Sequence, residues 1–270
     1  MASVNSAAPV KTPAKLAFRN LGKTFMFQGA PKQALLGINA EIETGEFISI
    51  VGASGCGKST LIRIAAGLER ASEGGVYVED NLVVQPGPDR GMVFQQFSLF
   101  PWLSVKENVM FGIQDQYPDK RLRGDAALDW VDKVGLAEFA DYYPNQLSGG
   151  MQQRVAIARA LAPGPKVLLM DEPFAALDAQ TRGRMQRHLL EIWRKLDITV
   201  VFITHDLEEA VLLADKIFVL APNPGRLVAT LPIEIPRVKD GLERDKYEPN
   251  FAAVLKDLSG LLVTSTDAHG

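Results

Sequence analysis

Residues 52–59 read Gly-Ala-Ser-Gly-Cys-Gly-Lys-Ser and fit the pattern of a phosphate-binding loop. Glycines in such a loop let main-chain N–H groups approach phosphate oxygens, and the positive end of a following helix favours the same anion. The loop also has the setting that the pattern requires, because an apolar run at residues 47–51 precedes it and a helical stretch at residues 58–67 follows it. This arrangement predicts an α/β domain in which a buried strand ends at a phosphate site.

Several residues of this loop and of the helix start are candidate ligands of a nucleotide. We expect Lys58 to reach the β and γ phosphates of the nucleotide, and the Ser59 hydroxyl to occupy one coordination position of Mg²⁺. Cys56 is the single cysteine of the chain, and we interpret it as a small residue that fills space. A glycine-rich turn that binds nothing is the alternative. The residues expected to contact the nucleotide here are Gly52, Ser54, Gly55, Cys56, Gly57, Lys58, Ser59 and Thr60.

A second apolar run, at residues 167–170, ends in two acidic residues and Pro173. We expect Asp171 to hold Mg²⁺, through water or Ser59, and Glu172 to orient and deprotonate an attacking water. Phosphoryl transfer depends mostly on positioning and charge stabilisation, so one metal-holding and one water-polarising carboxylate are expected together. Taken alone, two acids after a strand form a solvated strand end about as often as they form a functional pair.

A second glycine-rich helix start lies at Ser148, Gly149 and Gly150, before a helical stretch at residues 152–161. Like the first loop, it can bind an anion through main-chain N–H groups. One chain would thus offer two phosphate sites. Both would be used if this turn of one copy closed over the nucleotide held by another copy. A glycine N-cap with no ligand is the simpler alternative.

The rest of the chain supplies further strands and helices. Apolar runs without alternation predict strands buried on both faces, and helical stretches between and after them predict a sheet of mostly parallel strands. The strands are expected at residues 47–51, 167–170, 199–204 and 216–220, and the helices at residues 58–67, 152–161, 179–196 and 207–214. Turn residues between 18 and 84 predict an antiparallel β portion. The section from about 96 to 161 shows only helical patterns, which indicates an inserted helical lobe.

These patterns divide the chain into a flexible N-terminal tail (1–15), one α/β domain (16–225) and a C-terminal tail (226–270) rich in Pro, Gly and charge. The formal net charge of −3 provides no global basic field, so we expect no nucleic-acid partner, although a local basic patch stays compatible with it. One cysteine excludes an internal disulfide. No apolar run approaches the about 18 residues that cross a bilayer, so any role at a membrane requires another chain.

The phosphate loop, the acidic strand end and the motif Leu-Ser-Gly-Gly-Met-Gln at residues 147–152 together resemble the ATP-binding cassette family. The resemblance extends in the expected order from about residue 16 to residue 220. It implies a P-loop NTPase core, ATP hydrolysis with Mg²⁺, and a second cassette subunit, identical or related.

Four further positions match functional residues of that family. Gln95 matches a glutamine that contacts Mg²⁺ and the attacking water, and His205 matches a histidine that hydrogen-bonds the γ phosphate. Asp178 lies in the match to a dimer-contact loop at residues 176–178, and Phe25 matches an aromatic residue that stacks on adenine. Family members often have Tyr at the last position, and a core aromatic residue is the alternative for Phe25.

Within this family, two passages resemble the branch of importers that transport nitrate, sulfonates and taurine. The first is Leu-Phe-Pro-Trp at residues 99–102, and the second is Pro-Gly-Arg at residues 224–226 followed by Pro236-Arg237. The resemblance implies a peripheral subunit on the cytoplasmic face of the inner membrane. That subunit would energise uptake of a small anionic solute, such as nitrate, a sulfonate, taurine or bicarbonate, through separate permease chains, with an indirect dependence on a solute-binding protein.

We expect residues 97–105, with Trp102, to form a socket for a short permease helix. A core tryptophan is the alternative at this position. Two other functions stay open at the level of sequence: a cassette of an efflux or lipid-trafficking system, and a soluble ATPase without a transport role.

Overall fold

The structure is a computed structural model that describes residues 14–238 and 242–267. In this part of the chain the central sheet has six strands in the order β10-β9-β3-β8-β7-β6. Neighbouring strands from β9 to β6 pair in parallel, and β10 pairs antiparallel with β9. The strands are β3 (Phe47–Gly52), β6 (Arg90–Val93), β7 (Val167–Asp171), β8 (Thr199–Ile203), β9 (Lys216–Ala221) and β10 (Arg226–Pro232).

The central strands are apolar on both faces, and their alternate residues pack into two separate cores. Ile48 and Ile50 of β3 face the core that contains α1 (Lys58–Ala65), whereas Phe47 faces the core that contains α5 (Ala179–Leu196) and α6 (Leu207–Leu213). Every residue of β7 and β8 is buried, and burying one large apolar side chain contributes about 1.5–3 kcal/mol. The predicted α/β fold with a mostly parallel sheet is therefore confirmed.

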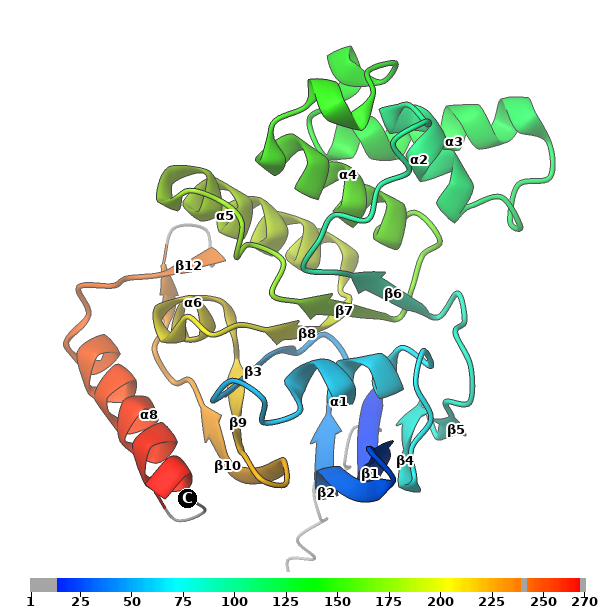
Figure 1. Ribbon diagram of the computed structural model, residues 1–270. Helices are drawn as coiled ribbons and strands as arrows, with labels where there is room; N and C mark the ends of the chain where they lie inside the picture. Colours follow the sequence, from blue (N-terminus) through cyan, green and yellow to red (C-terminus); the bar gives the residue numbers. More distant parts are fainter. Residues whose placement is uncertain (1–13, 239–241, 268–270) are drawn as a thin grey trace, which may run out of the picture.

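A second sheet, antiparallel throughout, has the order β2-β1-β4-β5 within the described residues. Its buried residues, such as Leu16 and Val76, share a core with α1. Figure 1 shows this sheet at the end of the molecule opposite the helices of the middle section. Its strands are β1 (Leu16–Phe27), β2 (Ala30–Ile42), β4 (Glu73–Val78) and β5 (Asn81–Leu82). The antiparallel N-terminal portion is thus confirmed.

The middle section forms a helical lobe of α2 (Val105–Gly112), α3 (Lys120–Lys133) and α4 (Gly149–Leu161), which Figure 1 shows gathered beyond β6 and β7. Helix α2 begins at a capping box, in which Ser104 Oγ accepts from Glu107 N and the Glu107 carboxylate accepts from Ser104 N. Ser148 is the N-cap of α4. Local capping chemistry therefore fixes where two helices of the lobe begin.

The segment after residue 225 is more structured than its composition indicates. Strand β10 joins the central sheet, β11 (Arg237–Val238) pairs with β12 (Glu243–Arg244), and α8 (Pro249–Asp267) packs against α6 and β9. Along β10 exposed and half-buried residues alternate, so it lacks the continuous apolar run that marks β7 and β8. The sheet therefore continues into the predicted C-terminal tail.

The predicted N-terminal tail falls mostly on residues 1–13, which lie outside the described residues. At its end, Lys15 N donates to Ile42 O (2.7 Å) and Lys15 Nζ pairs with Glu79 Oε1 (2.5 Å), so this residue is anchored on the second sheet. Among the described residues, no helix combines the length and apolar character needed to cross a bilayer.

Candidate active site

The phosphate loop connects β3 to α1 and has the tight geometry that its glycines allow. Gly57, the N-cap of α1, has φ +96°, and a Cβ there would lie 2.6 Å from Leu35 Cδ2. Lys58 Nζ donates to the carbonyl oxygens of Gly52 (2.7 Å) and Ala53 (3.1 Å). The ammonium group is thereby held against the main chain of the loop.

A cavity of about 450 Å³ opens over this loop and brings most of the predicted residues together. Cys56 is an exception, because its side chain is buried in the core and its N–H donates to Ala53 O (3.2 Å). Burial raises the pKa of the Cys56 thiol, which fits a space-filling residue. The residues that line the cavity are Gly52, Ser54, Gly55, Gly57, Lys58, Ser59, Thr60, Glu172 and His205.

Ser59 and Asp171 bring two oxygen ligands together at the start of α1 and the end of β7. Ser59 Oγ donates to Asp171 Oδ1 at 3.2 Å. Burial raises the pKa of Asp171, and the bond from Ser59 opposes this rise. Hydroxyl and carboxylate oxygens are ligands that Mg²⁺ prefers, so this pair fits the predicted metal position.

Glu172, the first residue after β7, is held in an uncommon main-chain conformation. Its φ is +46°, a region that non-glycine residues rarely occupy, and its N–H donates to Ile203 O (3.0 Å). Its Oε2 lies 3.2 Å from His205 Nδ1 and 3.3 Å from Gln95 Nε2. The carboxylate is therefore oriented from two sides beside Lys58, an arrangement that can activate a water molecule.

The second glycine-rich helix start does not line this cavity. Ser148 Oγ accepts from Met151 N (3.3 Å) at the first turn of α4. A Cβ on Gly150 would lie 2.6 Å from Thr181 Cγ2, so the start of α4 packs closely on the start of α5. Within one chain the two predicted phosphate-binding elements thus do not line the same cavity, as expected if a second copy completes each site.

Asp178 and Phe25 lie outside the cavity as well. Asp178 Oδ1 caps α5 by accepting from Gln180 N (3.1 Å) and Thr181 N (3.0 Å), and the hydrogen bonds from Thr181 lower the pKa of Asp178. Phe25 is at the end of β1, with its side chain 37% exposed and Lys23 Nζ 4.6 Å from its ring centroid. This exposure disfavours the core alternative for Phe25.

Glu209 is a buried acid beside the site. It is not among the residues predicted from the sequence. It accepts from Thr204 Oγ1 (2.5 Å) and Gln186 Nε2 (2.9 Å), and burial raises its pKa. In the sequence it resembles an ordinary acid in the first turn of a helix, where the dipole favours negative charge. Only the packing of α5 against α6 reveals its burial.

A larger cavity of about 530 Å³ lies between α5, α6 and residues 244–247. Its lining combines leucines with Gln186, Arg244 and Tyr247, and includes neither the phosphate loop nor Glu172. We therefore place the candidate active site in the smaller cavity, because that is where the groups needed for phosphoryl transfer meet.

The chain is similar to several known proteins. A family model described as "ABC transporter" matches residues 35–175. The nitrate import ATP-binding protein of Synechocystis sp. is 48% identical over 251 residues, which are 92% of this chain and 94% of that protein. The bicarbonate transport ATP-binding protein of Synechococcus elongatus is 47% identical over 272 residues, covering 94% of this chain and 41% of that protein.

Solved structures resemble the chain over most of its length. A dimeric post-hydrolysis state of an ATP-binding cassette bound to ADP and Pi aligns with a TM-score of 0.72 and 35% identity, covering 81% of this chain and 99% of that chain. A protein of Clostridium perfringens described as part of an ABC transporter complex aligns with a TM-score of 0.73 and 29% identity, covering 82% and 90%.

Proposed function

The chain belongs to the ABC transporter family, and we propose that it is the ATP-hydrolysing subunit of a bacterial importer. The observation that carries the proposal is the meeting of Lys58, Glu172 and His205 in one cavity above a phosphate loop. The names of the nitrate and bicarbonate relatives favour import over the efflux, lipid-trafficking and non-transport alternatives.

In this proposal residues in and around the cavity bind ATP and hydrolyse it. Lys58 binds the β and γ phosphates of ATP, and Phe25, outside the cavity, stacks on the adenine. Glu172 accepts a proton from water as the water oxygen bonds to the γ phosphorus and the bond to the bridging oxygen of ADP breaks. Gln95 and His205 keep the Glu172 carboxylate in place, since both lie within about hydrogen-bond distance of it.

The ligand set at the end of β7 fits Mg²⁺. Ser59, Asp171 and Gln95 offer hydroxyl, carboxylate and amide oxygens, which are the hard ligands that this ion prefers. The contact between Ser59 Oγ and Asp171 Oδ1 already brings two of them together. When bound, Mg²⁺ supplies positive charge that offsets the charge of the phosphate oxygens.

We further propose that two cassettes share each nucleotide. Ser148, Gly149 and Gly150 of a partner copy would bind the γ phosphate of the ATP held at Lys58, with Asp178 at the contact between the copies. Two ATP molecules would then hold the cassettes together, and hydrolysis would release them, which converts binding energy into movement. A similar cassette forms a dimer with ADP and Pi bound.

The aromatic surface around Trp102 is the proposed contact with the permease. Trp102 is 70% exposed, and its ring lies 5.6 Å from that of Phe100, which lies 4.6 Å from that of Phe111. Asn108 fixes the loop that presents these rings, because it accepts from Phe100 N (2.9 Å) and donates to Leu103 O (3.0 Å). The exposure of Trp102 disfavours a core role and suits docking of an apolar helix.

The transported solute is proposed from the relatives to be a small anion of the nitrate or bicarbonate type. The subunit would act at the cytoplasmic face of the inner membrane, bound to separate permease chains and depending indirectly on a solute-binding protein. A test is co-expression with the permease and solute-binding chains that copurify with it from membranes, followed by reconstitution in liposomes. We expect ATP-dependent uptake of a small oxyanion with the wild-type chain and none with Glu172→Gln; ATP-driven export of the solute would contradict import.

A further inference from the structure

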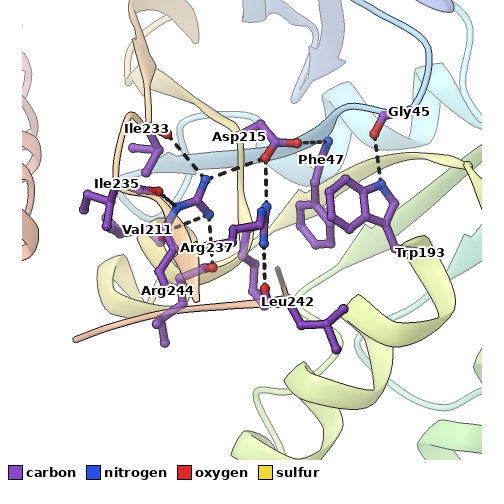
Figure 2. Close-up of polar contacts among 12 residues, drawn as sticks. Gly45, Phe47, Trp193, Val211, Asp215, Ile233, Ile235, Arg237, Leu242 and Arg244 are labelled. Atoms are coloured by element: carbon purple, nitrogen blue, oxygen red, sulfur yellow. Dashed lines mark hydrogen bonds and ion pairs between the residues drawn. The ribbon is translucent and has the colours of Figure 1, made fainter. Parts of the chain in front are cut away.

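Two arginines of the C-terminal region meet around one aspartate, although the proposed function assigns them no task. They belong to the Pro-Arg segment, which we define as residues 233–238 and 242–247. Arg237 Nη2 lies 2.8 Å from Asp215 Oδ1, and Arg244 Nη2 lies 3.6 Å from the same oxygen (Figure 2). The other carboxylate oxygen of Asp215 accepts from Phe47 N at 3.0 Å, which ties the cluster to β3.

The same two guanidinium groups cap the C-terminal end of α6. Arg244 Nη1 donates to the carbonyl oxygens of Val211 (3.4 Å) and Leu212 (3.2 Å), and Arg237 Nη2 donates to that of Leu213 (2.7 Å). These carbonyls belong to the last turn, where a helix leaves its acceptors without internal partners and favours positive charge. Two cations on one end of a seven-residue helix are therefore a strong local constraint on α6.

Further contacts hold these arginines in place. Arg244 is buried and also donates through Nε to Ile235 O (2.8 Å), and burial lowers its pKa to about 10, which leaves it charged at neutral pH. Arg237 donates to Leu242 O (3.0 Å) and lies 4.9 Å from the ring centroid of Trp193 in α5. The Pro-Arg segment thus contacts α5 and α6 directly and is linked to β3 through Asp215, whose contacts Figure 2 shows.

The opposite end of α6 leads directly into the candidate active site. Asp206 is the N-cap of this helix and His205 precedes it, so a rigid helix about 10 Å long separates the capped carbonyls from the imidazole. Glu209 in the first turn accepts from Thr204 Oγ1 (2.5 Å), the residue on the other side of His205. A shift of α6 along or about its axis would therefore move His205 relative to Glu172.

We propose that Arg237 and Arg244 are positioning residues for ATP hydrolysis, which hold α6 so that His205 stays directed at Glu172 and the γ phosphate. The Pro236-Arg237 pair thereby contributes to turnover. Changes in the Pro-Arg segment would alter the rate of hydrolysis. This positioning role rests on the proposed function, because it requires that His205 contributes to hydrolysis.

The test combines steady-state kinetics with a double-mutant cycle. Arg237→Ala should lower kcat about tenfold, because a small displacement of a catalytic group is costly, while KM and the Kd for ATP stay within about twofold of wild type. Adding Arg237→Ala to His205→Ala should cause no further loss, since the arginine acts through that histidine. Arg237→Lys keeps the charge beside Asp215 but cannot reproduce the fork of hydrogen bonds, so its kcat should lie between those of wild type and Arg237→Ala.

Arg19→Ala is the matched control, because Arg19 also pairs with an aspartate, Asp80, and lies 4.5 Å from the ring centroid of Tyr77, but it is far from α6. Its kcat should equal that of wild type. Unchanged kcat in folded Arg237→Ala or, if that variant does not fold, in Arg237→Lys would overturn the inference. Equal losses from Arg237→Ala in the wild-type and His205→Ala backgrounds would overturn it too. If His205→Ala alone leaves kcat unchanged, the role of His205 in the proposed function fails instead.

Discussion

His205 Nδ1 lies 3.2 Å from Glu172 Oε2, so residues that follow two neighbouring strands of the central sheet meet at one carboxylate. The His205 side chain is 66% exposed, whereas that of Glu172 is 22% exposed. The imidazole thus stands at the rim of the cavity, where it can contact a phosphate, and the carboxylate lies deeper, where it can hold water. This division suits an ATPase site that opens toward a partner.

Glu172→Gln should abolish turnover while preserving ATP binding. The amide keeps the size of the side chain but cannot accept the proton, and loss of a general base costs at least about a hundredfold in rate. Phosphate release assays and ATP binding by calorimetry would check this. Near-normal hydrolysis would show that another group is the base.

Lys58→Ala should instead weaken nucleotide binding. Hydrogen bonds to charged groups contribute about 1.5–3 kcal/mol, so the Kd for ATP should rise about ten- to hundredfold. Lys133→Ala is the control, because this exposed lysine pairs with Asp129 on α3, away from the cavity. Equal affinities for the two variants would argue against phosphate binding by Lys58.

Trp102→Ala should reduce the stimulation of hydrolysis by the permease and leave ATP binding by the isolated subunit unchanged. The substitution removes the most exposed ring of the Trp102, Phe100 and Phe111 cluster, and with it the apolar contact area. Val263→Ala is a control at another exposed apolar residue, which is 62% exposed and lies on α8, outside the lobe. Full stimulation of Trp102→Ala by reconstituted permease would contradict the docking surface.

Glu209→Gln should change how stability depends on pH. Burial raises the pKa of Glu209, so between its ordinary value of 4.5 and the raised value the folded state binds more protons than the unfolded chain. Wild-type stability therefore loses a contribution as pH rises through this window. The free energy of unfolding of Glu209→Gln minus that of wild type should increase with pH, as urea titrations can measure. A difference that does not change with pH would show that the pKa of Glu209 is not raised in the folded state.

The sequence predicts those features that depend on residues close together in the chain. The phosphate loop and the strands at β7 and β8 could be recognised because glycine spacing and continuous apolar runs are local signals. Strand β10 was not predicted, because it lacks a continuous apolar run. Its pairing with β9 stabilises it instead. The burial of Glu209 and the capping of α6 by Arg237 depend on how distant segments pack, and residue order alone does not contain that information.

The most direct test of a nucleotide shared between two copies uses the Glu172→Gln background with and without Ser148→Arg. Both proteins should bind ATP as monomers, because Ser148 does not line the cavity over Lys58. In sedimentation velocity with saturating ATP, we expect Glu172→Gln to form a dimer and Glu172→Gln with Ser148→Arg to stay monomeric. Equal dimer formation by both proteins would contradict the shared site.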